Sequence, residues 1–121
     1  MEEVLVPFSL KKELKMKVGI PKEIINNESR VGMTPAGVFE LVRNNHTVYV
    51  QTGAGDGSGF SNSDYQQVGA IVLDTIGHVY AMSDMIVKVK EPIKEEYALV
   101  QRGQVVLPIF ILPLVRSLPK P

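Results

Sequence analysis

The sequence predicts an α/β fold in which a mostly parallel sheet is flanked by helices. Short apolar or β-branched segments alternate with segments of helical periodicity three or four times along the chain. This alternation is typical of βαβ units, whose strands lie parallel in one sheet. The expected helices also begin near capping residues such as Thr34 and Ser63, or end at a glycine such as Gly69.

The composition is that of a single folded domain. The chain has 121 residues, of which 45% are hydrophobic and 21% charged, values typical of a folded chain rather than a disordered one. Thirteen basic residues balance thirteen acidic ones, which argues against nucleic acid or an anionic membrane as the partner. The absence of cysteine from the sequence excludes disulfides and thiolate chemistry and is compatible with a cytoplasmic location.

The stretch from Lys17 to Thr34 contains the most informative residue, Arg30. Residues 18–20 are expected to form a buried strand that Pro21 ends, because proline has no amide hydrogen for a strand ladder. A polar loop follows, and Thr34-Pro35 is typical of a helix start. Arg30 therefore precedes a helix where open α/β sheets bind ligands, and its guanidinium is suited to clamp a carboxylate. From these residues alone, a solvated arginine is the simpler interpretation.

The chain from residue 35 to residue 89 divides into helices and strands of ordinary length. Apolar residues recur at helical spacing in the predicted helices, and the predicted strands are rich in β-branched or aromatic residues. In chain order we expect a helix over 35–44, a strand over 46–51, a short helix within 61–67, a strand over 70–73, a helix over 75–81 and a strand over 85–89.

The glycine-rich segment Thr52 to Phe60 does not predict a nucleotide site. Its glycines stand at positions 53, 55, 57 and 59, and no three of them have the spacing Gly-x-Gly-x-x-Gly of a dinucleotide-binding turn. A surface loop or an active-site wall is the preferred interpretation. No metal site is expected, because His78 has no second histidine, cysteine or carboxylate at ligand spacing, and His46 is interpreted as structural.

The second stretch whose residues could take part in ligand binding or catalysis is Lys88 to Pro92. In an extended strand Lys88 and Lys90 share one face, and Pro92 marks the carboxyl end of that strand. Lys90 would then point into the same crevice as Arg30. Such a pair could hold a small α-keto acid, with Arg30 on the carboxylate and Lys90 on the carbonyl oxygen. The alternative is an edge strand that its lysines protect from pairing.

Three segments carry a resemblance to a known family: KVGIPKEIINNESRVGMTPAGV, QTGAGDGSGFSNSDYQQVGA and IVKVKEPIKEEYALVQRGQ. From Met16 to Gln104 the chain resembles alanine dehydrogenase and its relative, the α subunit of proton-translocating nicotinamide nucleotide transhydrogenase. Lys90 favours alanine dehydrogenase, because the transhydrogenase subunit usually departs from lysine at this position.

The resemblance implies a substrate-side domain in which Arg30 and Lys90 bind pyruvate or L-alanine. It implies reversible oxidative deamination of L-alanine to pyruvate and ammonium, with NAD as the cofactor of the intact enzyme. It also implies a cytoplasmic homo-oligomer, commonly a hexamer, whose active site lies between this domain and a Rossmann domain. No membrane partner is expected, since the apolar run 105–115 is shorter than the about 20 residues that a bilayer requires.

Both ends of the chain depart from the family pattern. We expect residues 16–106 to be the family domain, 1–15 a non-family extension with translation starting at Met16, and 107–121 an aberrant apolar tail. Ile111 occupies the place of the family's catalytic histidine. The coding sequence TTT ACC TAT TTT CAT CTT GCC gives a family-like FTYFHLA, whereas a shift of one base forward gives LPIFILP, as in residues 107–113. A frameshift therefore accounts for the tail.

The resulting expectation is an incomplete, catalytically incompetent fragment. The sequence contains no Rossmann fingerprint, so we expect no NAD to bind this chain alone. The alternatives are the corresponding domain of a transhydrogenase α subunit, a residual pyruvate binder, and an interaction protein that joins full-length subunits. A genuine small protein whose proline-rich tail docks on its own sheet or on a partner is a further alternative.

Overall fold

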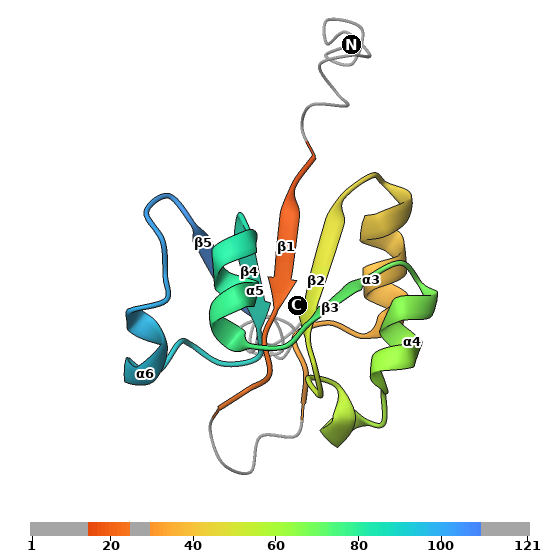
Figure 1. The fold of residues 1–121 in the computed structure, drawn as a ribbon, viewed down its shortest axis with the longest axis horizontal. Coiled ribbons are helices and arrows are strands. Elements are labelled where there is room, and N and C mark those ends of the chain that lie inside the picture. The colour runs from red at the N-terminus through yellow and green to blue at the C-terminus, as the bar shows by residue number, and fades with distance from the viewer. Residues whose placement is uncertain (1–14, 25–29, 110–121) are drawn as a thin grey trace, which may run out of the picture.

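Five parallel strands form one sheet within the part of the chain that the computed structural model describes, residues 15–24 and 30–109. The strand order is β3-β2-β1-β4-β5, with β1 in the middle (Figure 1). The strands are β1 (Lys17–Ile20), β2 (Thr47–Gln51), β3 (Ile71–Leu73), β4 (Met85–Lys88) and β5 (Val105–Pro108). The helices are α3 (Pro35–Arg43), α4 (Asn62–Gln67), α5 (Ile76–Met82), α6 (Lys94–Tyr97) and the 3-10 helix η1 (Asp56–Ser58).

The chain winds outward from the centre of the sheet twice, in opposite directions. It passes from β1 to β2 and β3, then returns across the sheet to β4 beside β1, and ends at β5. Every pairing is parallel, which confirms the predicted α/β fold. The strand order reverses between β1 and β4, and the carboxyl ends of two such neighbouring strands border the usual ligand crevice.

The predicted elements up to residue 89 are all present, and their boundaries shift by one or two residues. Thr34 caps α3, because its hydroxyl accepts from the Gly37 amide at 3.3 Å. Ser61, two residues before the predicted capping residue Ser63, caps α4 and pairs with Asp64 in a capping box. The last predicted strand ends at Lys88 rather than Val89.

Three elements were not expected from the sequence. Helices η1 and α6 are a single turn each, too short to show a helical period. Strand β5 ends in Pro108, a residue type that has no amide hydrogen for a strand ladder. The pairing is possible because β5 lies at the edge of the sheet, with β4 as its neighbour on one side, and an edge strand tolerates proline.

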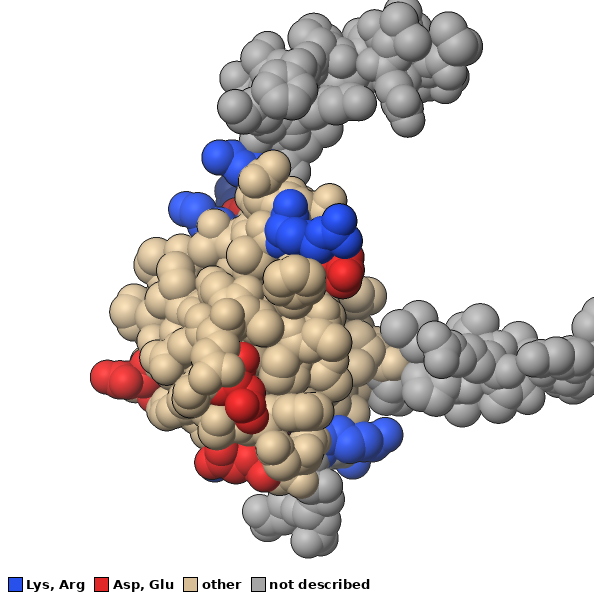
Figure 2. Space-filling view, turned by 90° about the vertical axis from the view of Figure 1, so that its right-hand side faces the viewer, with Lys and Arg blue, Asp and Glu red and all other residues tan. Residues whose placement is uncertain are grey.

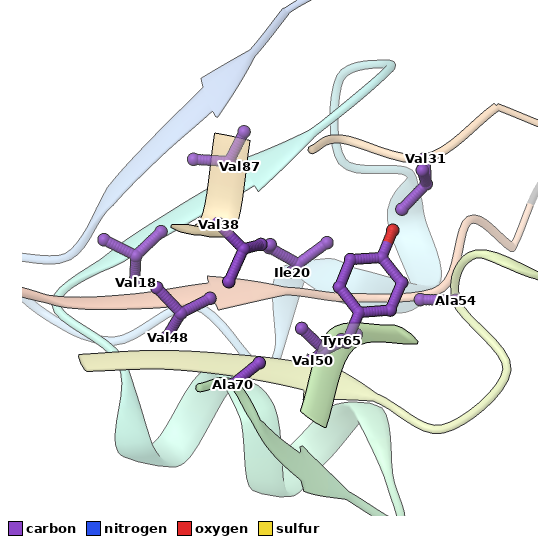
Figure 3. Packing of buried hydrophobic residues seen from close by; sticks show 10 residues of the cluster. All are labelled: Val18, Ile20, Val31, Val38, Val48, Val50, Ala54, Tyr65, Ala70 and Val87. Carbon is purple, nitrogen blue, oxygen red and sulfur yellow. The ribbon is translucent and has the colours of Figure 1, made fainter. Parts of the chain in front are cut away.

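One face of the sheet packs against α3 and α4. Side chains alternate along a strand, so Val18 and Ile20 point to this face, where Val38 of α3 and Tyr65 of α4 cover them (Figure 3). The Tyr65 hydroxyl donates to the Met33 carbonyl at 2.8 Å. The core therefore also fixes the segment that leads into α3.

The opposite face packs against α5. Val79 and Tyr80 of this helix bury Ile86 of β4, with Leu99 and Val106 at the margin. The central strands are buried on both faces, and their sequences are therefore almost continuously apolar, as is typical of parallel sheets.

Gly32 marks the closest approach between the β1–α3 connection and β4. A Cβ added there would meet the Val87 carbonyl oxygen and would lie 2.8 Å from the Val87 carbonyl carbon. Both neighbours are backbone atoms, which cannot rotate away. The residue following Val31 must therefore be small, and this contact fixes the path of the loop that carries Arg30.

The surface on the α3–α4 side carries charges of both signs. Figure 2 shows the basic and acidic side chains in small separate groups with uncharged surface between them. The Nδ1 of His46, a residue interpreted as structural from the sequence, accepts a hydrogen bond from the Met16 amide at 3.0 Å. Within residues 15–24 and 30–109, the structure has no helix of the length and apolarity that a membrane span needs.

Replacing Gly32 with alanine is expected to destabilise the protein by about 1–3 kcal/mol, because the new methyl group overlaps the β4 backbone. Urea unfolding measures the change. Gly77→Ala is the control, since its nearest neighbour is Leu99 at 3.8 Å and it lies inside α5. That variant should gain up to about 1 kcal/mol from helix propensity. Equal stability of the Gly32→Ala variant and the wild type would contradict the predicted backbone contact.

Stability is expected to fall at alkaline pH through Tyr65. Burial, with Asp64 nearby, raises the pKa of Tyr65 from 10.0 to about 12. The folded state thus holds the phenol proton more tightly than the unfolded state. This contribution is complete below pH 10 and is lost as the pH rises toward 12. Unfolding free energies measured from about pH 9 to about pH 11 should decline less steeply in Tyr65→Phe than in the wild type. Parallel declines of the unfolding free energy with pH in the two proteins would contradict this prediction.

Candidate functional site

The candidate site lies at the carboxyl ends of the strands, around the reversal of strand order between β1 and β4. A cavity of about 300 Å³ opens there, and each lining residue follows the end of a strand. Its lining consists of Arg30, Val31, Thr34, Ser58, Phe60, Val89 and Ile109. The connections after β1, β2, β4 and β5 thus meet at one place, as expected for the ligand crevice of an open parallel sheet.

Arg30 is the positively charged residue of this lining. It is exposed, and it follows β1 in the connection that Gly32 presses against β4. Valine, phenylalanine and isoleucine side chains form most of the remaining wall. An arginine in the lining of a mainly apolar cavity suits a small anion with an apolar part, because a guanidinium can bind a carboxylate and an apolar wall excludes water from the rest of the ligand.

Lys90 lies beside this cavity but not in its lining. Val89, the residue before it, forms part of the wall. Lys90 is half-buried, and its backbone carbonyl accepts a hydrogen bond from the Lys88 ammonium at 2.9 Å. The structure therefore brings Arg30 and Lys90 to the same edge of the sheet, while their joint contact with a ligand remains a prediction.

The sequence suggested that Lys88 and Lys90 share one face of a strand, but the structure places the two side chains in different environments. Strand β4 ends at Lys88, so the alternation of faces does not continue to Lys90. The Lys88 side chain is 1% exposed and its ammonium lies 2.9 Å from Glu23 Oε1 and 3.6 Å from Glu96 Oε1. A lysine that could have protected an exposed edge is instead the centre of a buried ionic cluster, which we define as Lys88, Glu23 and Glu96.

The buried ionic cluster is fully hydrogen-bonded. Glu23 Oε2 accepts from the Val89 amide at 2.9 Å, and Glu96 Oε1 accepts from the Ile93 amide at 2.9 Å. The Tyr80 hydroxyl donates to Glu96 Oε2 at 3.2 Å. Among the described residues, every buried side-chain nitrogen and oxygen has a hydrogen-bond partner, which is the condition under which buried charges are tolerated.

The pKa of Tyr80 is shifted by its position beside this cluster. Burial raises the pKa of the Tyr80 phenol well above its ordinary value, and the nearby Glu96 carboxylate raises it further by charge and by accepting its hydrogen bond. Tyr80 therefore remains a neutral donor to Glu96 at physiological pH.

A second cavity, of about 380 Å³, lies beneath the α3 side of the sheet. Val18, Val87 and Leu107 of the sheet line it, and Leu41 and Met33 close another side. Its lining is almost wholly apolar, and the titratable side chain in it is His46, whose Nδ1 accepts a hydrogen bond from the Met16 amide. No cluster of three metal-ligating side chains occurs in residues 15–24 and 30–109.

Two parts of the predicted site have different outcomes. Ile111, at the place of the expected histidine, lies outside the described residues, as do most of the predicted tail and residues 1–14. The roles of Glu23, Lys88 and Glu96 were missed. A lysine inside the apolar run Met85–Val89, with glutamates in the flanking connections, was the available signal, since a buried lysine requires a buried partner.

The sequence pattern of the family described as "Alanine dehydrogenase/PNT, N-terminal domain" matches residues 19–116. A protein named alanine dehydrogenase from Mycolicibacterium smegmatis is 49% identical over 89 residues, which are 74% of this chain and 24% of that protein. The chain therefore spans about a quarter of the length of this curated relative. The family match extends past residue 106, and the predicted boundary there stays a prediction.

Two solved structures share the fold. One named L-alanine dehydrogenase superposes with a TM-score of 0.73 at 46% identity, over 75% of this chain and 25% of that one. A transhydrogenase from Sinorhizobium meliloti superposes with a TM-score of 0.72 at 33% identity, over 77% of this chain and 26% of that one. The two superpositions are nearly equal, whereas the sequence identity is higher for L-alanine dehydrogenase.

Replacing Lys88 with methionine is expected to destabilise the protein by about 3–5 kcal/mol, because it leaves the Glu23 and Glu96 carboxylates buried without their cation. Urea unfolding at neutral pH measures this change. The exposed pair Arg43–Glu40, at 3.1 Å and 60% exposure on both sides, provides the control. Glu40→Gln should cost less than about 1 kcal/mol. A similar small loss in both variants would show that Lys88 is not held in a buried pair.

Proposed function

Because the chain belongs to the family of alanine dehydrogenase/PNT N-terminal domains, we propose that it is the substrate-side part of an L-alanine dehydrogenase. In the intact family this activity converts L-alanine, NAD and water to pyruvate, ammonium and NADH. This chain would contribute the substrate-binding half of the site. Arg30 binds the carboxylate of pyruvate or L-alanine, and Lys90 binds the carbonyl oxygen of pyruvate.

The observation that carries the proposal is the position of Arg30 at the cavity formed by the strand ends. Arg30 follows β1, and Lys90 follows β4, the strand beside it where the order reverses. Two cations at this edge match the two oxygen-bearing groups of an α-keto acid. The apolar residues of the cavity wall suit the methyl group of pyruvate.

The cations would act by charge and orientation. A guanidinium holds a carboxylate in two parallel hydrogen bonds and so fixes the plane of the substrate. An ammonium at the carbonyl oxygen stabilises the negative charge that develops there when a nucleophile adds to the carbonyl carbon. Neither group supplies a base, so binding and polarisation are the contributions that we assign to this chain.

The described residues do not fit a bound dinucleotide. The β1–α3 connection has no Gly-x-Gly-x-x-Gly sequence, and the glycines of residues 53–59 do not have that spacing. We therefore assign NAD to the intact family members and no redox step to this chain alone. By resemblance we also propose a cytoplasmic homo-oligomer for the intact protein, commonly a hexamer, with small molecules as its partners.

The corresponding domain of a transhydrogenase is the second candidate. The superposition on the transhydrogenase supports it, at 33% identity against 46% for the L-alanine dehydrogenase. Lys90 favours alanine dehydrogenase, by the resemblance noted for this position. Pyruvate binding by the chain would distinguish the two candidates.

Isothermal titration calorimetry with pyruvate tests the proposal on the whole chain. Arg30→Ala is expected to weaken binding by about 10- to 100-fold, because it removes a charge-assisted bidentate contact. Arg102→Ala, an exposed arginine in the turn before β5, is the matched control and should leave binding unchanged. The absence of pyruvate heat in the wild type would contradict the binding role. NADH formation from L-alanine and NAD would contradict the assignment of binding without catalysis.

A further inference from the structure

The backbone on both sides of the Val89–Lys90 peptide bond is held by the buried ionic cluster. The Val89 amide donates to Glu23 Oε2 at 2.9 Å. The Lys90 carbonyl accepts from the Lys88 ammonium at 2.9 Å. Glu23 Oε1 and the Lys88 ammonium are themselves joined at 2.9 Å. One ion pair therefore clamps a segment of two residues from its amide end to its carbonyl end.

This clamp is built from groups that water does not reach. The side chains of Lys88 and Glu23 are 1% and 2% exposed, and Lys88 has a second anionic neighbour in Glu96 at 3.6 Å. Hydrogen bonds to ionised groups are stronger than those between neutral groups, and in a buried site no water replaces them if they break. The backbone of Val89 and Lys90 is thus fixed more firmly than an ordinary loop.

We infer that Glu23 and Lys88 are positioning residues that set the direction of the Lys90 ammonium and the place of Val89 in the cavity wall. The inference rests on the proposed function only for the identity of the ligand. Neither Glu23 nor Lys88 lines the cavity, so both act through the backbone that they hold. Losing the clamp leaves the Lys90 charge present but no longer aimed at the ligand.

The same cluster provides a matched control. Tyr80 donates to Glu96 Oε2 at 3.2 Å, whereas Glu23 and Lys88 make the hydrogen bonds to the Val89–Lys90 segment. Tyr80→Phe therefore removes a hydrogen bond from the buried cluster without loosening the clamp. A purely structural role for the cluster predicts similar effects of Glu23→Gln and Tyr80→Phe, whereas a positioning role predicts an effect at Lys90 from Glu23→Gln alone.

Nuclear magnetic resonance on the ¹⁵N-labelled full chain tests the inference without a ligand. In Glu23→Gln we expect the Val89 amide to exchange with solvent about tenfold faster and the Lys90 amide signal to shift, because the carboxylate acceptor is lost. Tyr80→Phe should leave both signals as in the wild type. Should Glu23→Gln fail to fold, Glu23→Asp keeps the charge and withdraws the carboxylate by one methylene, and the same two signals should move.

Pyruvate titration of the same samples gives the second readout. We expect about a tenfold weaker affinity in Glu23→Gln and no change in Tyr80→Phe. Unchanged Val89 exchange and Lys90 shift in the Glu23 variant would overturn the inference. If those signals move but the wild type binds no pyruvate, the clamp stands and the proposed function fails. Equal weakening of pyruvate binding in both variants would assign the cluster to stability alone and overturn the positioning role.

Discussion

The buried pair between Lys88 and Glu23 is the interaction on which the functional edge of this protein depends. It joins the end of β4 to the connection after β1 across 65 residues of sequence, and Glu96 adds the connection before β5. Such pairs contribute little net stability compared with apolar residues of the same volume, because desolvating two charges offsets most of their attraction. What the pair provides is a defined geometry for the two strand ends that flank the cavity.

The strand order places this pair where a ligand is expected. Outward winding in two directions from β1 leaves the carboxyl ends of the parallel strands β1 and β4 side by side. The close contact of Gly32 with the β4 backbone brings the loop of Arg30 to the same place. Packing, ion pairing and topology therefore converge on one crevice, and the residues that match the relatives cover about a quarter of the length of those relatives.

The periodicity of the sequence was sufficient for most of the fold. Alternation of β-branched strands with capped helices predicted the parallel sheet, and Thr34-Pro35 predicted the start of α3 within one residue. Elements of a single turn, such as α6, carry no period to detect. Strand β5 was missed because Pro108 argues against a strand unless the strand is known to be at an edge, and edge position is a property of the assembled sheet.

The candidate site divides in the same way. The residue types and the positions of Arg30 and Lys90 at the ends of apolar segments were visible in the sequence, which by itself determined the fold class and the two cations. Only the tertiary structure decided that Lys88 is buried between Glu23 and Glu96 while Lys90 is not. The reason is physical: β4 ends at Lys88, and the carboxylates that neutralise this lysine come from connections that meet it only when the sheet is assembled.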